Sequence, residues 1–220
     1  GVAVMRARLA ALALVMAGIV APAAADPIPG DVGGRVAAAY AGPTLARFED
    51  ASNEMERLAG ALCERPGGAA LSDARAGFAA LVPAWGGVSV LRFGPLQAQN
   101  RFERVFFWPD PRGVITRQVQ ALLAGDDENA LSPEGIAGKS VALQGLPALE
   151  FVLYGADAEE LATNAGSRRC RYGAAVAGNV AAIARELKAE WVADAPFHTA
   201  FTTPSAGSDP YRSTREVAGE

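Results

Sequence analysis

Glu150 is the residue in this sequence whose surroundings are most unusual for a group that can carry out chemistry. It lies in the segment 145–154, GLPALEFVLY, where all the other residues are apolar, aromatic or glycine. On a helix, Leu146 and Leu153 would lie on the same side as Glu150, so we expect its face to be buried. A buried carboxylate must be paired, protonated or bound to a metal. One interpretation makes Glu150 a ligand or general base at the centre of a helical bundle.

A second interpretation gives Glu150 a structural role. In the first helical turn after Pro147, its carboxylate would accept hydrogen bonds from backbone N–H groups. It could equally pair with an arginine such as Arg92 or Arg101. The residue types alone favour neither interpretation over the other.

Most other catalytic patterns are absent from the sequence. It contains no Gly-x-Ser-x-Gly elbow, no phosphate-binding loop, no Gly-x-Gly-x-x-Gly and no Cys-x-x-Cys. The only histidine, His198, is expected in a loop from Pro196 to Pro204, and we interpret it as a surface residue. Any metal bound by this chain alone must therefore rely on carboxylate and carbonyl oxygens, which favour hard cations or iron.

The N-terminus has the three-part layout of a secretory signal peptide. Arg6 and Arg8 precede an apolar run over 9–20, and small residues lead to a predicted cleavage after Ala25. The sequence therefore predicts export, with residues 1–25 removed.

The charge and the aromatic content of the chain limit the classes of partner that it can bind. The chain has 20 Lys and Arg against 24 Asp and Glu, for a net charge of −4, and few aromatic residues. This composition argues against binding to nucleic acid or anionic lipid.

In an oxidising exported compartment, the two cysteines, Cys63 and Cys170, predict a disulfide rather than a metal site.

Helix signals dominate the first half of the mature chain. Apolar residues recur every three or four positions, and Gly or Pro marks the breaks between segments. The first expected helix runs from Thr44 to the break at Pro66, and the second from an N-cap at Ser72, through a kink at Pro83, to a break at Gly94. A third is expected from Gln97 to Trp108. A fourth begins with an N-cap at Asp110 and Pro111 at the first helical position, and it ends at Gly125.

The second half continues in the same way, and no alternating strand pattern occurs. A short helix or turn is expected after Ser132, a buried central helix over 140–154, and a long helix over 168–193. The pattern predicts an all-α helical bundle. A capping-box sequence at 213–216 indicates that another helix begins there. We therefore expect a bundle over 26–212 and the start of a truncated second helical segment over 213–220.

A series of short landmarks occurs in order between Tyr40 and Trp191. They are Leu62-Cys63, Ala84-Trp85, Arg92-Phe93-Gly94-Pro95, Asn100-Arg101, Phe107-Trp108-Pro109-Asp110, Gln144 to Glu150, and Cys170. In this order they resemble the imelysin family, a group of exported bacterial proteins named for an insulin-cleaving peptidase.

The resemblance implies a helical protein of two related four-helix bundles with a functional cleft between them, of which this chain is similar to the first half. It also implies a periplasmic location and an association with iron uptake. The family signature is Gly-x-His-x-x-Glu, whose His and Glu are the proposed metal or active-site residues. Gly145 and Glu150 match it, but Pro147 stands at the His position, as in a proline-bearing branch of the family.

These observations together predict a non-catalytic metal- or ligand-binding component associated with iron uptake. Glu150 would be the central residue and the metal ligand, and Gly145 would permit close backbone approach. Arg92, Arg101 and Asp110 would line the same region. The expected cofactor is iron or another divalent cation. The expected partners are a metal ion or small ligand and a periplasmic or membrane uptake protein, with no nucleic acid.

Two alternatives come from other functional classes. The chain could be a metallopeptidase in which Glu150 is the general base or a ligand. It could also be a structural interaction domain in which Glu150 is only a buried salt-bridge partner.

Overall fold

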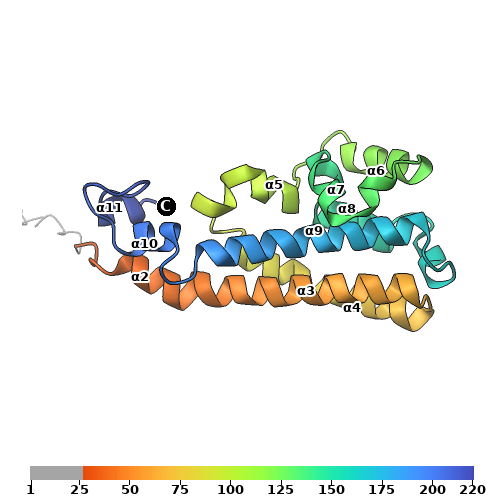
Figure 1. The fold of residues 1–220 in the computed structure, drawn as a ribbon, viewed down its shortest axis with the longest axis horizontal. Coiled ribbons are helices and arrows are strands. Elements are labelled where there is room, and N and C mark those ends of the chain that lie inside the picture. Colours follow the sequence, from red (N-terminus) through yellow and green to blue (C-terminus); the bar gives the residue numbers. More distant parts are fainter. Residues whose placement is uncertain (1–26) are drawn as a thin grey trace, which may run out of the picture.

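The computed structural model describes residues 27–220, and every regular element in that range is a helix. Three long helices, α3 (Gly42–Glu64), α4 (Gly68–Val88) and α9 (Arg168–Glu190), run along the long axis of the molecule (Figure 1). The prediction of an all-α bundle is confirmed. The predicted signal peptide, residues 1–25, lies outside the described residues.

Helix α3 lies at the centre of the packing, because it contacts α9 on one side and α4 on the other. Its residues Leu45, Phe48, Met55 and Leu62 recur at helical spacing and are buried. Removing each such side chain from water contributes about 1.5–3 kcal/mol. The apolar periodicity that predicted this helix is therefore also what holds it in the bundle.

The predicted disulfide between Cys63 and Cys170 is present in the structure, with the two Cα atoms 5.5 Å apart. It joins the last turn of α3 to the first turn of α9. The bridge closes a loop across a sequence separation of 107 residues, which restricts the unfolded chain and stabilises the fold by a few kcal/mol.

Shorter helices fill the space that a fourth long helix would occupy. In Figure 1 they lie along α9, on the side away from α3. The α-helices are α5 (Arg101–Val105), α6 (Val114–Ala124), α7 (Pro133–Ala137) and α8 (Leu146–Tyr154). The 3-10 turns between them and around them are η2 (Gly94–Leu96), η3 (Ala98–Asn100), η4 (Glu128–Leu131), η5 (Val141–Leu143) and η6 (Ala158–Ala162).

Two predicted helices are shorter than expected. In the segment 97–108 only α5 is α-helical, because Gln99 and Asn100 adopt left-handed φ angles of 57° and 54° that interrupt the helix. In the segment 140–154 only α8 is α-helical, because the backbone of Gly145 is extended.

The starts of two predicted helices also differ. Helix α4 begins at Gly68 rather than at Ser72, since the Gly67 carbonyl already accepts a hydrogen bond from the backbone N–H of Leu71. Pro83 lies inside α4, as expected. Helix α6 begins at Val114, three residues later than a start at Pro111 would require.

Both ends of the described chain meet at one end of the molecule (Figure 1). Helix α2 (Val32–Val36), the π-helix η1 (Ala37–Ala41), α10 (Pro196–Thr202) and the single-turn α11 (Thr214–Val217) lie there. Ser213 caps α11 as the sequence indicated, accepting a hydrogen bond from Glu216 N–H. Whether a second helical segment begins here stays a prediction.

Aromatic rings hold this end together. We call them the end cluster: Phe93, Trp191, Phe197, Phe201 and Tyr211. Trp191 lies 5.0 Å from Phe197 and 5.1 Å from Phe201, measured between ring centroids. His198 is half-buried on α10, so its predicted placement in a loop is wrong.

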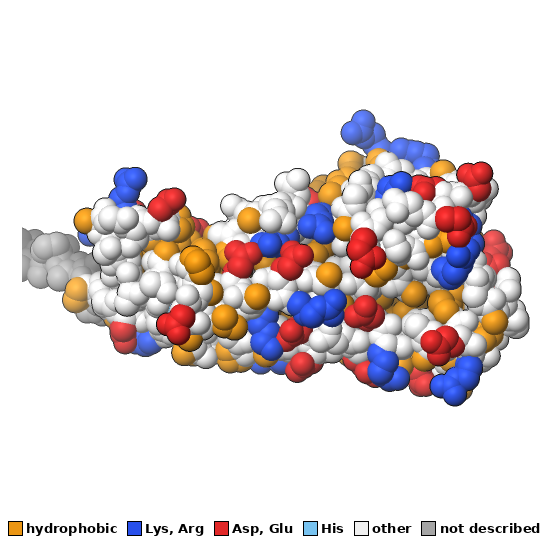
Figure 2. Space-filling view, in the orientation of Figure 1, with side chains coloured by type: hydrophobic (Ala, Val, Ile, Leu, Met, Phe, Trp, Pro, Cys, Tyr) orange, Lys and Arg blue, Asp and Glu red, His pale blue; other side chains and the backbone are white. Residues whose placement is uncertain are grey.

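The surface carries charges of both signs. On the face drawn in Figure 2, Lys and Arg side chains alternate with Asp and Glu, and no continuous basic stripe of the kind used by nucleic-acid-binding proteins crosses it. Across residues 27–220, none of the helices combines the length and the apolar character that crossing a membrane requires.

Candidate functional site

Two pockets adjoin at α8, and both are lined by Phe106, Pro147 and Glu150. The α4-side pocket has a volume of about 390 Å³, and its other wall residues include Phe78, Val82, Trp85, Ser89, Phe102 and Leu146. The α6-side pocket has a volume of about 510 Å³, and its other wall residues include Trp108, Asp110, Ile115, Thr116, Phe151 and Tyr154.

Helix α8 has two faces with different roles. Pro147, Glu150 and Tyr154 follow one another at helical spacing and line the pockets. Leu149 and Val152 point into the core and are fully buried. The core therefore fixes the orientation of α8, and that orientation presents Glu150 to the pockets.

Contacts at both ends hold α8 in place. At its N-terminus, Gly145 lies so close to α5 that an added Cβ atom would be 2.2 Å from the Val105 carbonyl oxygen. At its C-terminus, the buried Arg169 donates hydrogen bonds to the carbonyls of Phe151, Val152 and Ala156, at 2.8, 2.9 and 2.6 Å. Gly145 does permit close backbone approach, as expected, but the segment that approaches it is the chain's own backbone at Val105. Gly145 itself is buried.

Glu150 is exposed, so the expectation that its face is buried is wrong. The helix is apolar nearly all round, but the bundle covers only one side of it, and the pockets lie against the other. Among residues 27–220, the Glu150 carboxylate takes part in no hydrogen bond or ion pair of the chain. The partners that the structural interpretation required are therefore not found in the described part of the chain.

The two arginines proposed as partners are engaged elsewhere. Arg101, only 4% exposed, donates to Glu186 and Glu190 of α9 at 3.2 and 2.6 Å. Arg92 pairs with Glu103 at 3.5 Å, and its guanidinium lies 3.8 Å from the ring centroid of Phe102, a wall residue of the α4-side pocket. Arg92 thus contacts the wall of the site, and Arg101 supports the bundle.

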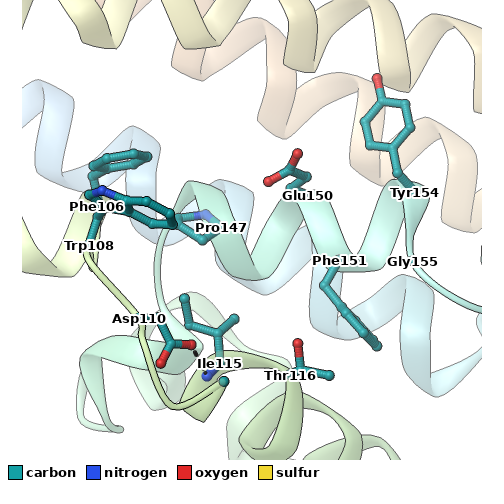
Figure 3. A pocket seen from close by; sticks show the side chains of 11 residues that line it. Phe106, Trp108, Asp110, Ile115, Thr116, Pro147, Glu150, Phe151, Tyr154 and Gly155 are labelled. Carbon is teal, nitrogen blue, oxygen red and sulfur yellow. Dashed lines mark hydrogen bonds between the residues drawn. The ribbon is translucent and has the colours of Figure 1, made fainter.

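Asp110 lines the α6-side pocket, but its carboxylate is already used. Its two oxygens accept hydrogen bonds from the backbone N–H groups of Val114 and Ile115, at 2.8 and 2.9 Å. These bonds, that of Ile115 first, lower the pKa of Asp110. Asp110 is therefore the cap of α6, although the helix begins later than expected. Figure 3 shows the Glu150 carboxylate directed away from Asp110.

The aromatic walls are the part of the site that sequence reasoning missed. Trp108 was interpreted only as a helix end, and Phe102, which is buried in the core, also lines the α4-side pocket. In the structure Trp108 is 68% exposed and lies 6.5 Å from Phe106, which in turn lies 6.5 Å from Trp85. The available signal was the density of aromatic residues over 102–108, next to Pro109.

The described residues do not form a metal centre by themselves. Within 27–220, no group of three or more His, Cys, Asp and Glu side chains is arranged to hold a metal ion. Glu150 is the one pocket carboxylate whose oxygens are not already bonded to the chain, and His198 lines neither pocket. One carboxylate is too few, since protein metal sites use three or more ligands.

Known proteins give two points of comparison. Residues 38–219 match the family described as Imelysin. Among solved structures, an imelysin-like protein from Psychrobacter arcticum 273-4 is similar, with a TM-score of 0.64 and 25% sequence identity. The alignment covers 72% of this chain and 48% of that chain, so this chain spans about half the length of that relative. No curated protein matches the sequence.

Proposed function

This chain belongs to the imelysin family, and from that premise we propose that it is an exported, periplasmic binding component linked to iron uptake. Its ligand site is the pair of pockets around Glu150, and it is not a peptidase. The observation that carries the proposal is one exposed carboxylate, without a partner among the described residues, shared by two pockets whose walls are otherwise largely apolar and aromatic.

The pocket walls support binding rather than simple surface exposure. Ligand pockets are concave and mostly apolar, with a few polar groups that fix orientation. The pockets at α8 have volumes of about 510 and 390 Å³, which are within the usual range for small ligands. Glu150 supplies the polar group at the point where the two pockets meet.

The residues present do not fit a metal site formed by this chain alone. Glu150 can supply one carboxylate, and the bonds of Asp110 to α6 leave it poorly suited to supply another. Iron bound here would therefore have to arrive with a ligand that brings the remaining donor atoms. An uptake partner in the periplasm or membrane would receive or deliver that ligand.

The metallopeptidase alternative has less support. Such an enzyme holds its metal with several side chains and uses the metal to activate water. Pro147 stands in α8 at the position where the family signature has histidine, and the only histidine of the sequence lies on α10. Glu150 alone would have to serve as both ligand and base.

An interaction domain is the second candidate, and one observation favours it. Val82, Trp108 and Tyr154 are large apolar or aromatic wall residues that stay exposed, Trp108 to 68% and Tyr154 to 49%. Exposed apolar surface of this kind is used in protein–protein contacts. In this alternative the carboxylate of Glu150 contributes nothing to binding.

Titration of the exported protein with iron(III) held by a positively charged chelator, beside elemental analysis and a titration with Fe²⁺ alone as the reference for the bare ion, tests the proposal. We expect binding that weakens at least about tenfold in Glu150→Gln, since hydrogen bonds to a charged group are worth about 1.5–3 kcal/mol. Glu134→Gln is the matched control, because Glu134 is exposed, lies on α7 and lines neither pocket.

Three outcomes separate the candidates. Equal iron binding by wild type and Glu150→Gln would place the iron elsewhere and contradict the proposal. Absence of iron binding in both would favour the interaction domain. Chelator-sensitive cleavage of a peptide that Glu150→Gln abolishes would establish the metallopeptidase instead.

A further inference from the structure

We propose that the two pockets around Glu150 recognise an organic cation, an ammonium or guanidinium group carried on an apolar stem. This inference rests on the proposed function, because it names the class of ligand for the same site.

The charge of the pocket walls is negative. The walls of the two pockets include the carboxylates of Glu150 and Asp110 and contain no Lys or Arg. The charge of Asp110 is already met by the N-terminal N–H groups of α6. The charge of Glu150 is therefore the one that a ligand would encounter. An anion would be repelled, and a neutral apolar ligand would remove water from the carboxylate without replacing its hydrogen bonds.

Two arginines beside the pocket walls, Arg75 and Arg92, do not neutralise Glu150, because each is paired with another acid. Two others, Arg117 and Arg169, donate to backbone carbonyls and form no ion pair with Glu150. Arg75 binds Glu159 at 2.8 Å and also donates to the Leu153 carbonyl at 2.9 Å. Arg92 is paired with Glu103. Neither forms an ion pair with Glu150.

Three wall residues already hold cations over their rings, and one of them is Phe151, whose ring centroid lies 5.5 Å from the guanidinium of Arg169. The guanidinium of Arg75 lies 5.2 Å from the ring centroid of Tyr154, and that of Arg92 lies 3.8 Å from the ring centroid of Phe102. Attraction between a cation and an aromatic face is strongest for Trp and increases as water is excluded. Cation–π contact is thus a mode of binding that the chain itself uses at this site.

Three other wall rings carry no cation of the described chain. Trp85, Phe106 and Trp108 follow one another with centroid separations of 6.5 Å and tilts of 42° and 32°. Phe106 lines both pockets together with Glu150. Figure 3 shows Phe106 and Trp108 beside Pro147, one helical turn from Glu150. A cationic head at Glu150 would leave its stem to lie on the rings of Phe106 and Trp108, since Trp85 is buried beneath them.

An organic cation fits this site better than a bare metal ion. A metal ion needs several donor atoms, and the site offers one available carboxylate. An ammonium group needs one carboxylate and gains further attraction from the aromatic faces. Its apolar stem also removes the surface of Trp108 and Phe106 from water, which is favourable by itself.

Titration calorimetry with three probes of equal length tests the inference: hexylammonium, hexan-1-ol and hexanoate. We expect hexylammonium to bind at least about tenfold more tightly than hexan-1-ol, and hexanoate to bind most weakly. Binding of hexylammonium should weaken with rising NaCl concentration, since ions screen an exposed charge pair.

Two variants locate the binding energy. Glu150→Gln should reduce hexylammonium binding to the level of hexan-1-ol, and Trp108→Ala should weaken both probes. Glu134→Gln should change neither. N-acetyl-lysine methylamide, compared with its norleucine analogue, separates a free amine from a lysine side chain of a polypeptide as the natural source. The lysine compound should match hexylammonium only if the backbone of a polypeptide can be accommodated.

The inference is overturned if hexylammonium does not bind, if hexan-1-ol binds equally well, or if Glu150→Gln binds hexylammonium like the wild type. Iron titration distinguishes a failure of this inference from a failure of the proposed function. Iron binding that depends on Glu150, without discrimination among the three probes, would retain the proposed function and exclude the organic cation. Selective hexylammonium binding without iron binding would retain the binding site and the organic cation, and exclude only the link to iron.

Discussion

The end cluster and the α8 pockets are both rich in aromatic residues, and they use them in opposite ways. In the end cluster the rings of Trp191, Phe201 and Tyr211 are buried against one another. At the α8 pockets, Trp108 and Tyr154 remain exposed although each contacts another aromatic ring. The two regions differ because the C-terminal segment from α10 onward covers the rings of the end cluster, whereas no described segment covers the rings of the pockets.

The acidic residues beside these rings differ in the same way. In the end cluster, the Tyr211 hydroxyl donates to a Glu220 carboxylate oxygen at 2.9 Å. Burial first, and this bond second, raise the pKa of Tyr211. Glu150 has no such donor among the described residues. A carboxylate next to aromatic rings is thus structural in one region and available to a ligand in the other.

The largest expected effect is on the end cluster. Phe201→Ala should destabilise the protein by about 3–5 kcal/mol, because Phe201 is 2% exposed and its loss leaves a cavity among the other four rings. Chemical denaturation followed by circular dichroism measures this change. A loss below about 1 kcal/mol would show that the end cluster is loosely packed, and the contrast with the pockets would fail.

Gly145→Ala should have the next largest effect, about 1–3 kcal/mol or more, since the new methyl group would overlap the Val105 carbonyl. The same denaturation experiment measures it. Gly60→Ala is the control, because Gly60 lies within α3 and nothing lies within 4 Å of its added Cβ. That variant should be stabilised by about 0.5–1 kcal/mol.

Tyr211→Phe should cost about 0.5–1.5 kcal/mol, the net worth of one hydrogen bond. The ring stays in the end cluster, so only the bond to Glu220 is lost. Glu220→Gln in the same background should add little if that bond is the whole effect. A further loss in the double variant would mean that Glu220 has another role.

Trp108→Ala should have the smallest effect on stability, within about 0.5 kcal/mol, because the side chain is 68% exposed. Its effect should instead be seen in hexylammonium binding. If Trp108→Ala destabilised the fold as much as Phe201→Ala, the aromatic rings of the pockets would be structural and the comparison would be wrong.

The long helices and the disulfide could be predicted from the sequence because their signals are local. The apolar positions of α3 and α9 recur along a single segment, and two cysteines in a chain predicted to be exported leave one internal pairing. The Asp110 carboxylate does bond the first N–H groups of α6, a signal that is also local, but the N-cap position predicted for Asp110 belongs to Gly113.

The exposure of Glu150 could not be predicted, because it depends on segments that are distant in sequence. Leu146 and Leu153 do flank it, as expected, and both are buried. What sequence periodicity cannot show is that α8 is short, that the bundle covers one side of it, and that the linker after α5 turns away at Phe106. Contact between Gly145 and Val105 sets that arrangement.

The bridge between Cys63 and Cys170 also determines how the protein would respond to cleavage. Every residue that lines the two pockets lies between these cysteines in the sequence. A protease cut anywhere in that stretch would leave two fragments still joined covalently. The nicked protein would migrate as one species on a gel without reductant and as two after reduction. A nick in the loops around the pockets would therefore not release either wall of the site.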